Sequence, residues 1–446
     1  MAASLWATSE DRRRIARSRA AVLMVGSYDG SGNYGDVLQF AAALDLVGGL
    51  PGSPLPIALV ERFAREHHAE LMRRFPALLG AAAYVHYDDG GSSAPDDDLL
   101  ELESGLAPRR SVLYLYGGGY MNRWWGARKV ALSDAAERLA GGGPPPLVAS
   151  GLQVDEASVA PGGVGHDLLS RSLWTGARGF RSLEFLSEHV GGTIELSGDD
   201  AVPALALGPS RPGAAVNFHF NDGDWVSDDP DTAMERVAAL LGGLGQAMGT
   251  TLELQPVLAY EDPRIRESRA LATFFGSHGA ALRAADIVPA EPLDILEDAA
   301  SNELARFRRG RLTVCRSYHV ALSSLLCGIP TVLLAENDYY DQKALELRGL
   351  FELDGSTVGI AGTPDDLPAA LEGLLDGPAR SALTDHLGKR AADVVRRQRR
   401  GRQATAAALR AGLERGQSQW LPSPRKIAAG VRRRIARSPA TEMLSM

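Results

Sequence analysis

The sequence predicts two tandem Rossmann-like, doubly wound α/β domains. With 446 residues, the chain is too long for one ordinary hydrophobic core, which favours two domains. Short apolar runs of strand length alternate with segments of helical periodicity, a pattern typical of mostly parallel sheets covered on both faces. Pro and Gly cluster at residues 208–213, and the alternation restarts after them, so this segment is the predicted linker.

The N-terminal domain is expected over residues 20–207, after a flexible, arginine-rich arm at 1–19. Its expected strands are apolar runs of strand length, at 21–25, 56–60, 84–87, 112–116, 147–150 and 194–196. Its expected helices show apolar residues at helical spacing, at 36–47, 61–72, 129–139 and 181–189. Each helix follows a strand, as the crossovers of a parallel sheet require.

The C-terminal domain is expected over residues 214–376. Its expected strands are 214–218, 252–257, 286–288, 311–314 and 331–334, and its expected helices are 232–247, 264–281 and 294–307. A long helix at 377–416 should pack back across the domains, before a basic tail at 417–446. Because ligands bind outside the carboxyl ends of parallel strands, we expect a cleft where the two domains face one another.

Composition excludes several classes of function. The net charge of −8 leaves no general footprint for nucleic acid. The two cysteines, Cys315 and Cys327, favour neither a disulfide framework nor a cysteine zinc site and suggest a reducing, cytoplasmic location. We predict no metal and no cofactor. The oligomeric state is left open.

The basic tail has two interpretations. Arg and Lys crowd its sequence, and apolar residues recur there at helical spacing. A basic amphipathic helix of this kind could lie on the inner face of the plasma membrane. A solvated, disordered tail is the alternative.

The segment from Val314 to Leu322 carries the strongest functional signal. An apolar strand ends at Arg316, Ser317 follows, and His319 stands where helical periodicity begins. Anions bind readily at a helix N-terminus, so the segment predicts a phosphate or carboxylate site. The alternative makes Arg316 a surface charge at a strand end and His319 a structural histidine.

A glycine loop precedes the first predicted helix. Residues 30–35 satisfy the G-x-G-x-x-G pattern of dinucleotide-binding folds, with Glu61 as a candidate ribose acceptor. Four residues separate this pattern from the strand end, however, and the carboxylate of Asp36 would repel a pyrophosphate. We therefore predict that Asp36 caps the helix, or orients or deprotonates a sugar hydroxyl.

A second glycine loop, 117–119, closes a later strand. Its three glycines allow an approach that a Cβ would obstruct. Asn122, Trp124 and Trp125 follow, and such aromatic and amide groups suit sugar recognition. The alternative is that the two tryptophans anchor the loop in the core.

Taken in order, these segments resemble the polysaccharide pyruvyl transferase family. The matching segments, spread over about residues 20–352, are Gly32-Asn33-Tyr34-Gly35-Asp36, Gly117-Gly118-Gly119, Ser150-Gly151-Leu152-Gln153, Arg178 with Ser182, Gly198-Asp199, Arg316-Ser317-Tyr318-His319, Gly328-Ile329-Pro330 and Asp341-Gln342-Lys343. The resemblance implies a two-domain, GT-B-like transferase. Such enzymes move pyruvate from phosphoenolpyruvate onto sugar hydroxyls as a ketal, in the synthesis of exopolysaccharides and cell-wall precursors.

Two positions depart from the family pattern. The family often has Arg-Asp where this chain has Arg178-Gly179. It also has one residue fewer between the arginine and the histidine that match Arg316 and His319. Within a helix, one additional residue would rotate the histidine by about 100°.

The resemblance also implies roles for individual residues. Arg316 would bind the phosphate or carboxylate of phosphoenolpyruvate, because a guanidinium grips such groups bidentately. His319 would be the general acid or a phosphate partner. Asp36 and Asn33 would face the acceptor sugar. The remaining predicted substrate contacts are Gly35, Gly118, Gly119, Asn122, Arg178, Ser317 and Lys343.

Two other functions stay open for a chain of this architecture. One is a GT-B glycosyltransferase with a nucleotide-sugar donor, since diphosphates also bind at helix N-termini. The other is a non-catalytic glycan-binding or assembly protein of the same fold. For Arg178 and Lys343, an ordinary surface charge is the alternative to a binding role.

Overall fold

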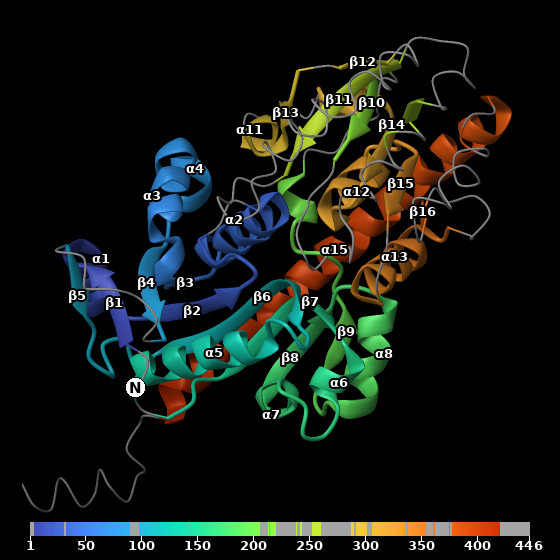
Figure 1. Cartoon of the computed structure of the whole chain (residues 1–446). Coiled ribbons are helices and arrows are strands. Elements are labelled where there is room, and N and C mark those ends of the chain that lie inside the picture. The colour runs from blue at the N-terminus through green and yellow to red at the C-terminus, as the bar shows by residue number, and fades with distance from the viewer. Residues whose placement is uncertain are drawn as a thin grey trace, which may run out of the picture.

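The computed structural model describes residues 4–30, 33–89, 98–141, 143–205, 213, 215–219, 238, 241–242, 252–259, 287–289, 291–300, 306–334, 338–353, 360–361, 374 and 377–419. Within these residues the chain forms two α/β units, each built on its own sheet (Figure 1). The predicted fold class, two tandem Rossmann-like α/β domains, is confirmed.

The N-terminal domain is built on a nine-stranded sheet. In spatial order its strands are β5 (Leu99–Glu101), β1 (Ser4–Thr8), β4 (Ala83–Asp88), β3 (Leu55–Glu61), β2 (Ala21–Gly26), β6 (Ser111–Met121), β7 (Leu147–Val154), β8 (Ser172–Ala177) and β9 (Ile194–Leu196). All neighbours from β4 to β9 pair in parallel, whereas β1 is antiparallel to both β4 and β5.

Helices cover both faces of this sheet. They are α1 (Ser9–Arg17), α2 (Tyr34–Gly48), η1 (Arg62–Ala64), α3 (Arg65–Arg74), α4 (Pro76–Leu79), α5 (Gly126–Ala140), α6 (Glu156–Val159), α7 (His166–Ser170), α8 (Phe180–His189) and η2 (Val202–Ala204). Successive side chains of β2 point to opposite faces. Met24 therefore belongs to the apolar cluster under α2, and Leu23 to the cluster under α5. Burial on both faces explains why β2 is apolar throughout.

The prediction of a flexible arm over residues 1–19 is wrong for residues 4–17. This segment forms β1 and α1, and it buries Leu5 and Ile15. Thr8 caps α1, because its side chain accepts a hydrogen bond from the backbone N–H of Asp11 at 3.1 Å. Four of the five arginines that suggested an arm, Arg12, Arg13, Arg14 and Arg17, lie in this short amphipathic helix.

The C-terminal domain is built on a smaller parallel sheet. Its order is β12 (Ile287–Pro289), β11 (Leu252–Leu258), β10 (Ala215–Phe218), β14 (Gly310–Cys315), β15 (Thr331–Leu334) and β16 (Ile360–Ala361), with β13 (Leu293–Asp294) paired to β11. The described helices of this domain are α11 (Ile295–Ala300), η3 (Phe307–Arg309), α12 (Tyr318–Leu326) and α13 (Asp338–Phe351). The predicted linker, the predicted helices at 232–247 and 264–281, and the tail beyond residue 419 lie largely outside the described residues.

The last described helix, α15 (Gly377–Gln419), packs against both domains. Figure 1 shows it running from the C-terminal domain at the upper right to the N-terminal domain at the lower left. Arg380 donates to the carbonyl of Arg311 at 2.8 Å in the C-terminal domain. About six turns further along the same helix, Arg402 donates to the carbonyl of Ala42 at 2.9 Å in the N-terminal domain. Among the described residues, no helix has the length and apolar character needed to cross a membrane.

Candidate functional site

The two domains meet where strands of the first sheet end and helices of the second domain begin. The backbone N–H of Tyr34 in α2 donates to the carbonyl of Ala259 at 2.7 Å, and its hydroxyl lies 3.0 Å from Ser323 Oγ in α12. The Tyr339 hydroxyl of α13 donates to the carbonyl of Gly119 at 3.2 Å. Motif positions from both halves of the chain therefore lie together at one boundary.

Gly35 and His319 meet across this boundary. Asn33 caps α2 by accepting the N–H of Gly35 at 3.1 Å. His319 projects from the first turn of α12, and a Cβ built on Gly35 would overlap its imidazole ring. Gly35 does not have a positive φ, so it is the space, and not the backbone angle, that requires glycine here. His319 thus reaches the N-terminus of a helix in the opposite domain.

Asp199 lies behind this histidine. Its Oδ2 is 3.4 Å from His319 Nε2 and 3.6 Å from Arg178 Nη1. Gln39 Nε2 is 3.1 Å from each carboxylate oxygen. Burial opposes ionisation of Asp199, but the neighbouring histidine, the arginine and the hydrogen bonds outweigh it and lower the pKa to about 2. Asp199 is therefore a buried anion that contacts basic side chains from both domains.

Asp36 is half-buried in the first turn of α2. Burial raises its pKa to about 6, and Asp29 adds to this rise. His319, Lys129 and Lys343 favour the ionised form and limit the shift. A carboxyl group with a pKa near 6 is ionised at neutral pH and is still basic enough to accept a proton.

Arg178 lies at the end of β8, and only 1% of it is exposed. The interpretation of Arg178 as a surface charge is therefore wrong. Its guanidinium carbon is 4.0 Å from the centroid of the Tyr318 ring. Among the described residues, neither Nε nor Nη2 of Arg178 has a hydrogen-bond partner. Buried polar groups normally have partners, so these two donors suit a ligand carboxylate or phosphate.

Lys343 approaches the same boundary from α13. Its Nζ lies 3.8 Å from the Tyr339 ring centroid and 4.7 Å from that of Tyr340. Burial lowers its pKa well below the ordinary value, and the positive charge of Arg178 adds to this, while Asp36 opposes it. An anionic ligand beside Lys343 would favour its charged form.

Arg316 is fully buried at the end of β14, so it is not a surface charge either. Ser317 is the N-cap of α12, and its side chain accepts the N–H of Val320 at 3.4 Å. The additional residue between Arg316 and His319 therefore falls at the start of the helix. It also places Tyr318 where its ring covers Arg178. Donor binding by Arg316 and Ser317 stays a prediction.

The glycines at 117–119 are close to protein atoms. Gly117 and Gly118 have φ values of 52° and 97°, which favour glycine. A Cβ on Gly118 would lie 2.7 Å from Ser27 Cβ, and one on Gly119 would lie 2.7 Å from Gln153 Oε1. Close packing thus explains these glycines, and substrate contact by Gly118 and Gly119 stays a prediction.

The loop after β6 presents an exposed aromatic ring. Asn122 shapes this loop, because its Oδ1 accepts the N–H groups of Trp124 and Trp125 at 2.9 and 3.1 Å and its Nδ2 donates to the carbonyl of Gly119 at 2.6 Å. The ring centroid of Trp124 is 5.5 Å from that of Tyr339, and 45% of Trp124 is exposed. Anchoring in the core is therefore the wrong interpretation for Trp124.

Two acidic side chains at the boundary had no predicted role. Asp200 accepts from Ser150 Oγ at 2.5 Å and from the N–H of Gly117 at 3.0 Å. Burial raises its pKa to about 6, and the adjacent Asp199 adds to the rise. Glu346 of α13 accepts from the Ser182 side chain at 2.6 Å. In the sequence, the motif Gly198-Asp199 is the only signal next to Asp200. Glu346 follows the last matching motif, so its only signal is its partner Ser182.

The dinucleotide interpretation loses its proposed ribose acceptor. Glu61 is buried, and its carboxylate binds Arg128 through contacts of 2.5 Å to Nε and 2.9 Å to Nη2. A carboxylate engaged in this bidentate pair is not available to a ribose hydroxyl. Residues 31 and 32 of the glycine loop lie outside the described residues.

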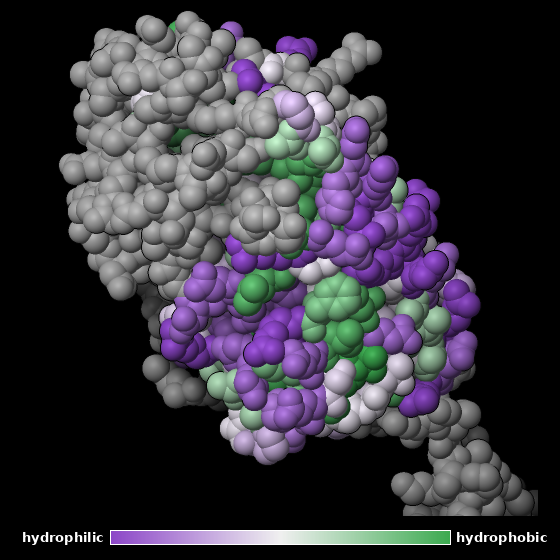
Figure 2. Space-filling view, turned by 90° about the vertical axis from the view of Figure 1, so that its right-hand side faces the viewer, coloured by the Kyte–Doolittle hydropathy of each residue, from purple (hydrophilic) through white to green (hydrophobic). Residues whose placement is uncertain are grey.

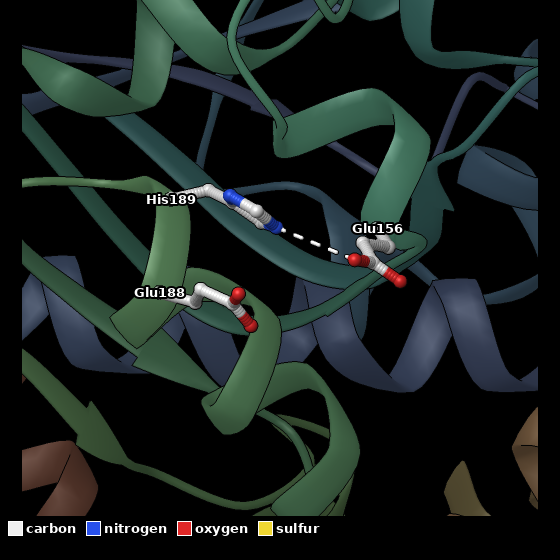
Figure 3. A group of neighbouring side chains, drawn as sticks. All are labelled: Glu156, Glu188 and His189. Carbon is white, nitrogen blue, oxygen red and sulfur yellow. Dashed lines mark ion pairs between the residues drawn. The ribbon is translucent and has the colours of Figure 1, made fainter.

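Figure 3 shows a group of potential metal ligands away from this boundary: Glu156, Glu188 and His189. Their ligand atoms lie within 4.8 Å of one another, and Glu156 Oε1 is 3.5 Å from His189 Nε2. Both carboxylates are exposed. The pair of Glu156 and His189 links α6 to the end of α8. Exposed acidic groups of this kind are common without an ion, so we assign no metal to this group.

Figure 2 shows the face on the right of Figure 1, where hydrophobic residues form a band between hydrophilic ones. On α8, Phe180 is 43% exposed, and on α13, Leu345 is 54% exposed. A Cβ on Gly349 of α13 would lie 3.0 Å from the Phe180 ring. The domain boundary therefore continues to the surface as an apolar contact between α8 and α13.

No family model matches the chain, and no curated protein sequence matches it. Among solved structures, UDP-GlcNAc 2-epimerase from Neisseria meningitidis bound to UDP-GlcNAc is 12% identical with a TM-score of 0.46, covering 84% of this chain and 99% of that one. Sucrose-phosphate synthase from Thermosynechococcus elongatus is 12% identical with a TM-score of 0.41, covering 92% of this chain and 100% of that one. Arabidopsis thaliana UGT89C1 complexed with quercetin is 10% identical with a TM-score of 0.47, covering 88% of this chain and 100% of that one. At TM-scores below 0.5 these likenesses carry no argument about activity.

Proposed function

We propose that the protein is a pyruvyl transferase, which moves the pyruvyl group of phosphoenolpyruvate onto two hydroxyls of a sugar as a ketal. The observation that carries the proposal is Arg178, a buried guanidinium with two unused donors among the described residues. Next to it lie His319 and Lys343, which come from the other domain. A small, multiply charged anion fits this set of cations.

The reaction needs one proton donor and one proton acceptor. The methylene carbon of phosphoenolpyruvate takes a proton and becomes a methyl group, while the adjacent carbon accepts the first hydroxyl oxygen. The bond from that carbon to the phosphate oxygen then breaks as the second hydroxyl oxygen attacks. Of the two hydroxyl protons, one replaces the proton delivered to the methylene carbon and the other leaves with phosphate.

The residues at the boundary match these needs. His319 delivers the proton to the methylene carbon, and Asp199 holds the imidazole in place from 3.4 Å. Asp36 accepts the proton of the attacking hydroxyl, as its pKa of about 6 allows. Arg178 and Lys343 bind the carboxylate and phosphate of the donor. Trp124 offers its exposed ring to the apolar face of the acceptor sugar.

Donor binding tests the proposal. Phosphoenolpyruvate at about 100 times its Kd should stabilise the folded protein by about 2.7 kcal/mol, measured as a rise in melting temperature. UDP-GlcNAc should give no comparable rise. Incubation with phosphoenolpyruvate and glycan precursors should then release phosphate and give a product heavier by one pyruvyl ketal. Stabilisation by the nucleotide sugar alone would favour the glycosyltransferase alternative.

A matched pair of variants tests the role of Arg178. Arg178→Met should weaken phosphoenolpyruvate binding by about 2–5 kcal/mol, the usual effect of truncating one partner of a buried charge pair. Arg181→Met changes an exposed arginine three residues further along the chain, in the first turn of α8, which pairs with Glu184, and should leave binding unchanged. Equal binding by both variants would exclude Arg178 as the donor ligand.

A further inference from the structure

Helix α8 begins without a capping side chain of its own. Its N-cap is Gly179, which makes no side-chain hydrogen bond. The first N–H groups of a helix have no partner within the helix, and Ser, Thr, Asp or Asn at the N-cap usually supplies one. Ser182 in the first turn of α8 is buried at the domain boundary, so its N–H group needs an acceptor from elsewhere.

Glu346 of α13 supplies that acceptor from the other domain. Its Oε1 accepts the N–H of Ser182 at 3.2 Å and the Ser182 hydroxyl at 2.6 Å. Ser182 is the third residue of α8, the one whose N–H an N-cap side chain usually binds. A Cβ built on Gly179 would fall onto Glu346 Oε2. The carboxylate therefore occupies the place where the side chain of residue 179 would begin.

Space, and not backbone conformation, explains why residue 179 is glycine. Its φ of −145° and ψ of −178° are extended values that any residue adopts. Glycine is therefore required by the space that Glu346 fills. One turn earlier on α13, Gln342 donates to the carbonyl of Val154 at 2.7 Å. Residues four apart share a helix face, so α13 contacts β7 and α8 with one face.

We propose that Glu346 is a positioning residue that caps α8 across the domain boundary, so that the anion site around Arg178 is complete only when the two domains are joined. Arg178 directly precedes the capped glycine, and its own N–H donates to the carbonyl of Leu152 at 2.8 Å. Its side chain lies between Asp199 of its own domain and Tyr318 and Glu346 of the other. The identity of the anion rests on the proposed function, but the cap does not.

Three variants separate the cap from the connection between domains. Glu346→Ala removes both, and Glu346→Gln keeps an acceptor oxygen for Ser182. The double variant Gly179→Asp with Glu346→Ala places an N-cap carboxylate within α8 but leaves the domains unconnected at this point. Two measurements apply to each folded variant: hydrogen exchange of the Ser182 amide, and the affinities of phosphoenolpyruvate and inorganic phosphate by calorimetry.

We expect Glu346→Ala to expose the Ser182 amide to exchange and to weaken anion binding at least tenfold. Glu346→Gln should keep most of the amide protection and most of the affinity. The double variant should restore amide protection without restoring affinity. Full affinity in the double variant, or unchanged affinity in Glu346→Ala, would overturn the positioning role. Unchanged exchange in Glu346→Ala would overturn the cap.

The same measurements keep this inference apart from the proposed function. If the unmodified protein binds phosphate but not phosphoenolpyruvate, the proposed donor is wrong, while the phosphate affinities still decide the role of Glu346. If it binds neither, both the donor and the anion site are wrong, and only the exchange result at Ser182 survives.

Discussion

Two glycines in the N-terminal domain accept side chains from the C-terminal domain, and they do so in different surroundings. At Gly35 the incoming group is His319, next to the half-buried Asp36. At Gly179 it is Glu346, which is 1% exposed and hydrogen-bonded to Ser182. Under the proposed function, the first contact places the groups that exchange protons with the substrate. The second contact joins helices of the two domains through the hydrogen bonds of Glu346 to Ser182. The comparison teaches that the space left by a missing Cβ can admit either a proposed reactive group or a group that joins the domains.

The largest expected effect removes the proton acceptor at the first contact. Asp36→Asn should lower kcat by about 10²–10⁴, the usual contribution of a positioned acid or base. In the unmodified protein a base must be ionised to act, so the rate should rise with pH through about 6, the raised pKa of Asp36. The measurement is the pH profile of kcat/KM for phosphate release.

Asp200 provides the control for this profile, because burial raises its pKa to about 6 as well. Asp200→Asn should keep the rise of rate with pH, at whatever overall rate the variant retains. If the rise instead disappears in Asp200→Asn and persists in Asp36→Asn, the base is Asp200, and the first contact is not the reactive one.

The next effect comes from filling the space at Gly35. Gly35→Ala puts a methyl group into the His319 ring and should displace the imidazole, which lowers kcat by about 10² for a shift near 1 Å. Gly48→Ala, near the other end of α2, meets nothing within 4 Å. It should leave kcat unchanged and stabilise the helix slightly, since alanine is the better helix former. Equal kcat values for the two variants would show that the first contact is not needed for chemistry.

The smallest expected effect concerns the acceptor. Trp124→Ala should raise the KM for the sugar by up to about tenfold, because aromatic contacts contribute about 0.5–1.5 kcal/mol. It should leave the affinity for phosphoenolpyruvate unchanged, because Trp124 is not one of the residues that we assign to the donor site. Leu100→Ala, exposed on the edge strand β5, is the control and should change neither. A change in donor affinity alone would assign Trp124 to the other substrate.

The sheets could be predicted where strands are buried on both faces. Such strands, like β2 and β6, are continuous apolar runs that stand out from the helical segments between them. The strand β1 could not be predicted, because one short run with a polar helix after it resembles an unstructured arm. The strand β8 was also missed, since Thr175 and Gly176 interrupt its apolar run.

The candidate site could be predicted in part. Strand ends and helix starts mark motif positions such as Gly35, Arg178 and His319, and the structure brings these to one boundary. The contact of Glu346 with Gly179 could not be predicted, because it joins residues 167 positions apart on elements of different domains. An ordinary glutamate within a helix carries no signal of the partner that tertiary packing gives it.

The course of α15 has a consequence for synthesis of the protein. Its later turns lie against the first sheet, where Gln398 donates to Asp200 at 3.3 Å and Gly401 packs on Ser197. A ribosome that has made only the first 376 residues has therefore not yet supplied the helix that covers this part of the earliest-made sheet. This part of the first sheet therefore stays uncovered until the later turns of α15 have been made.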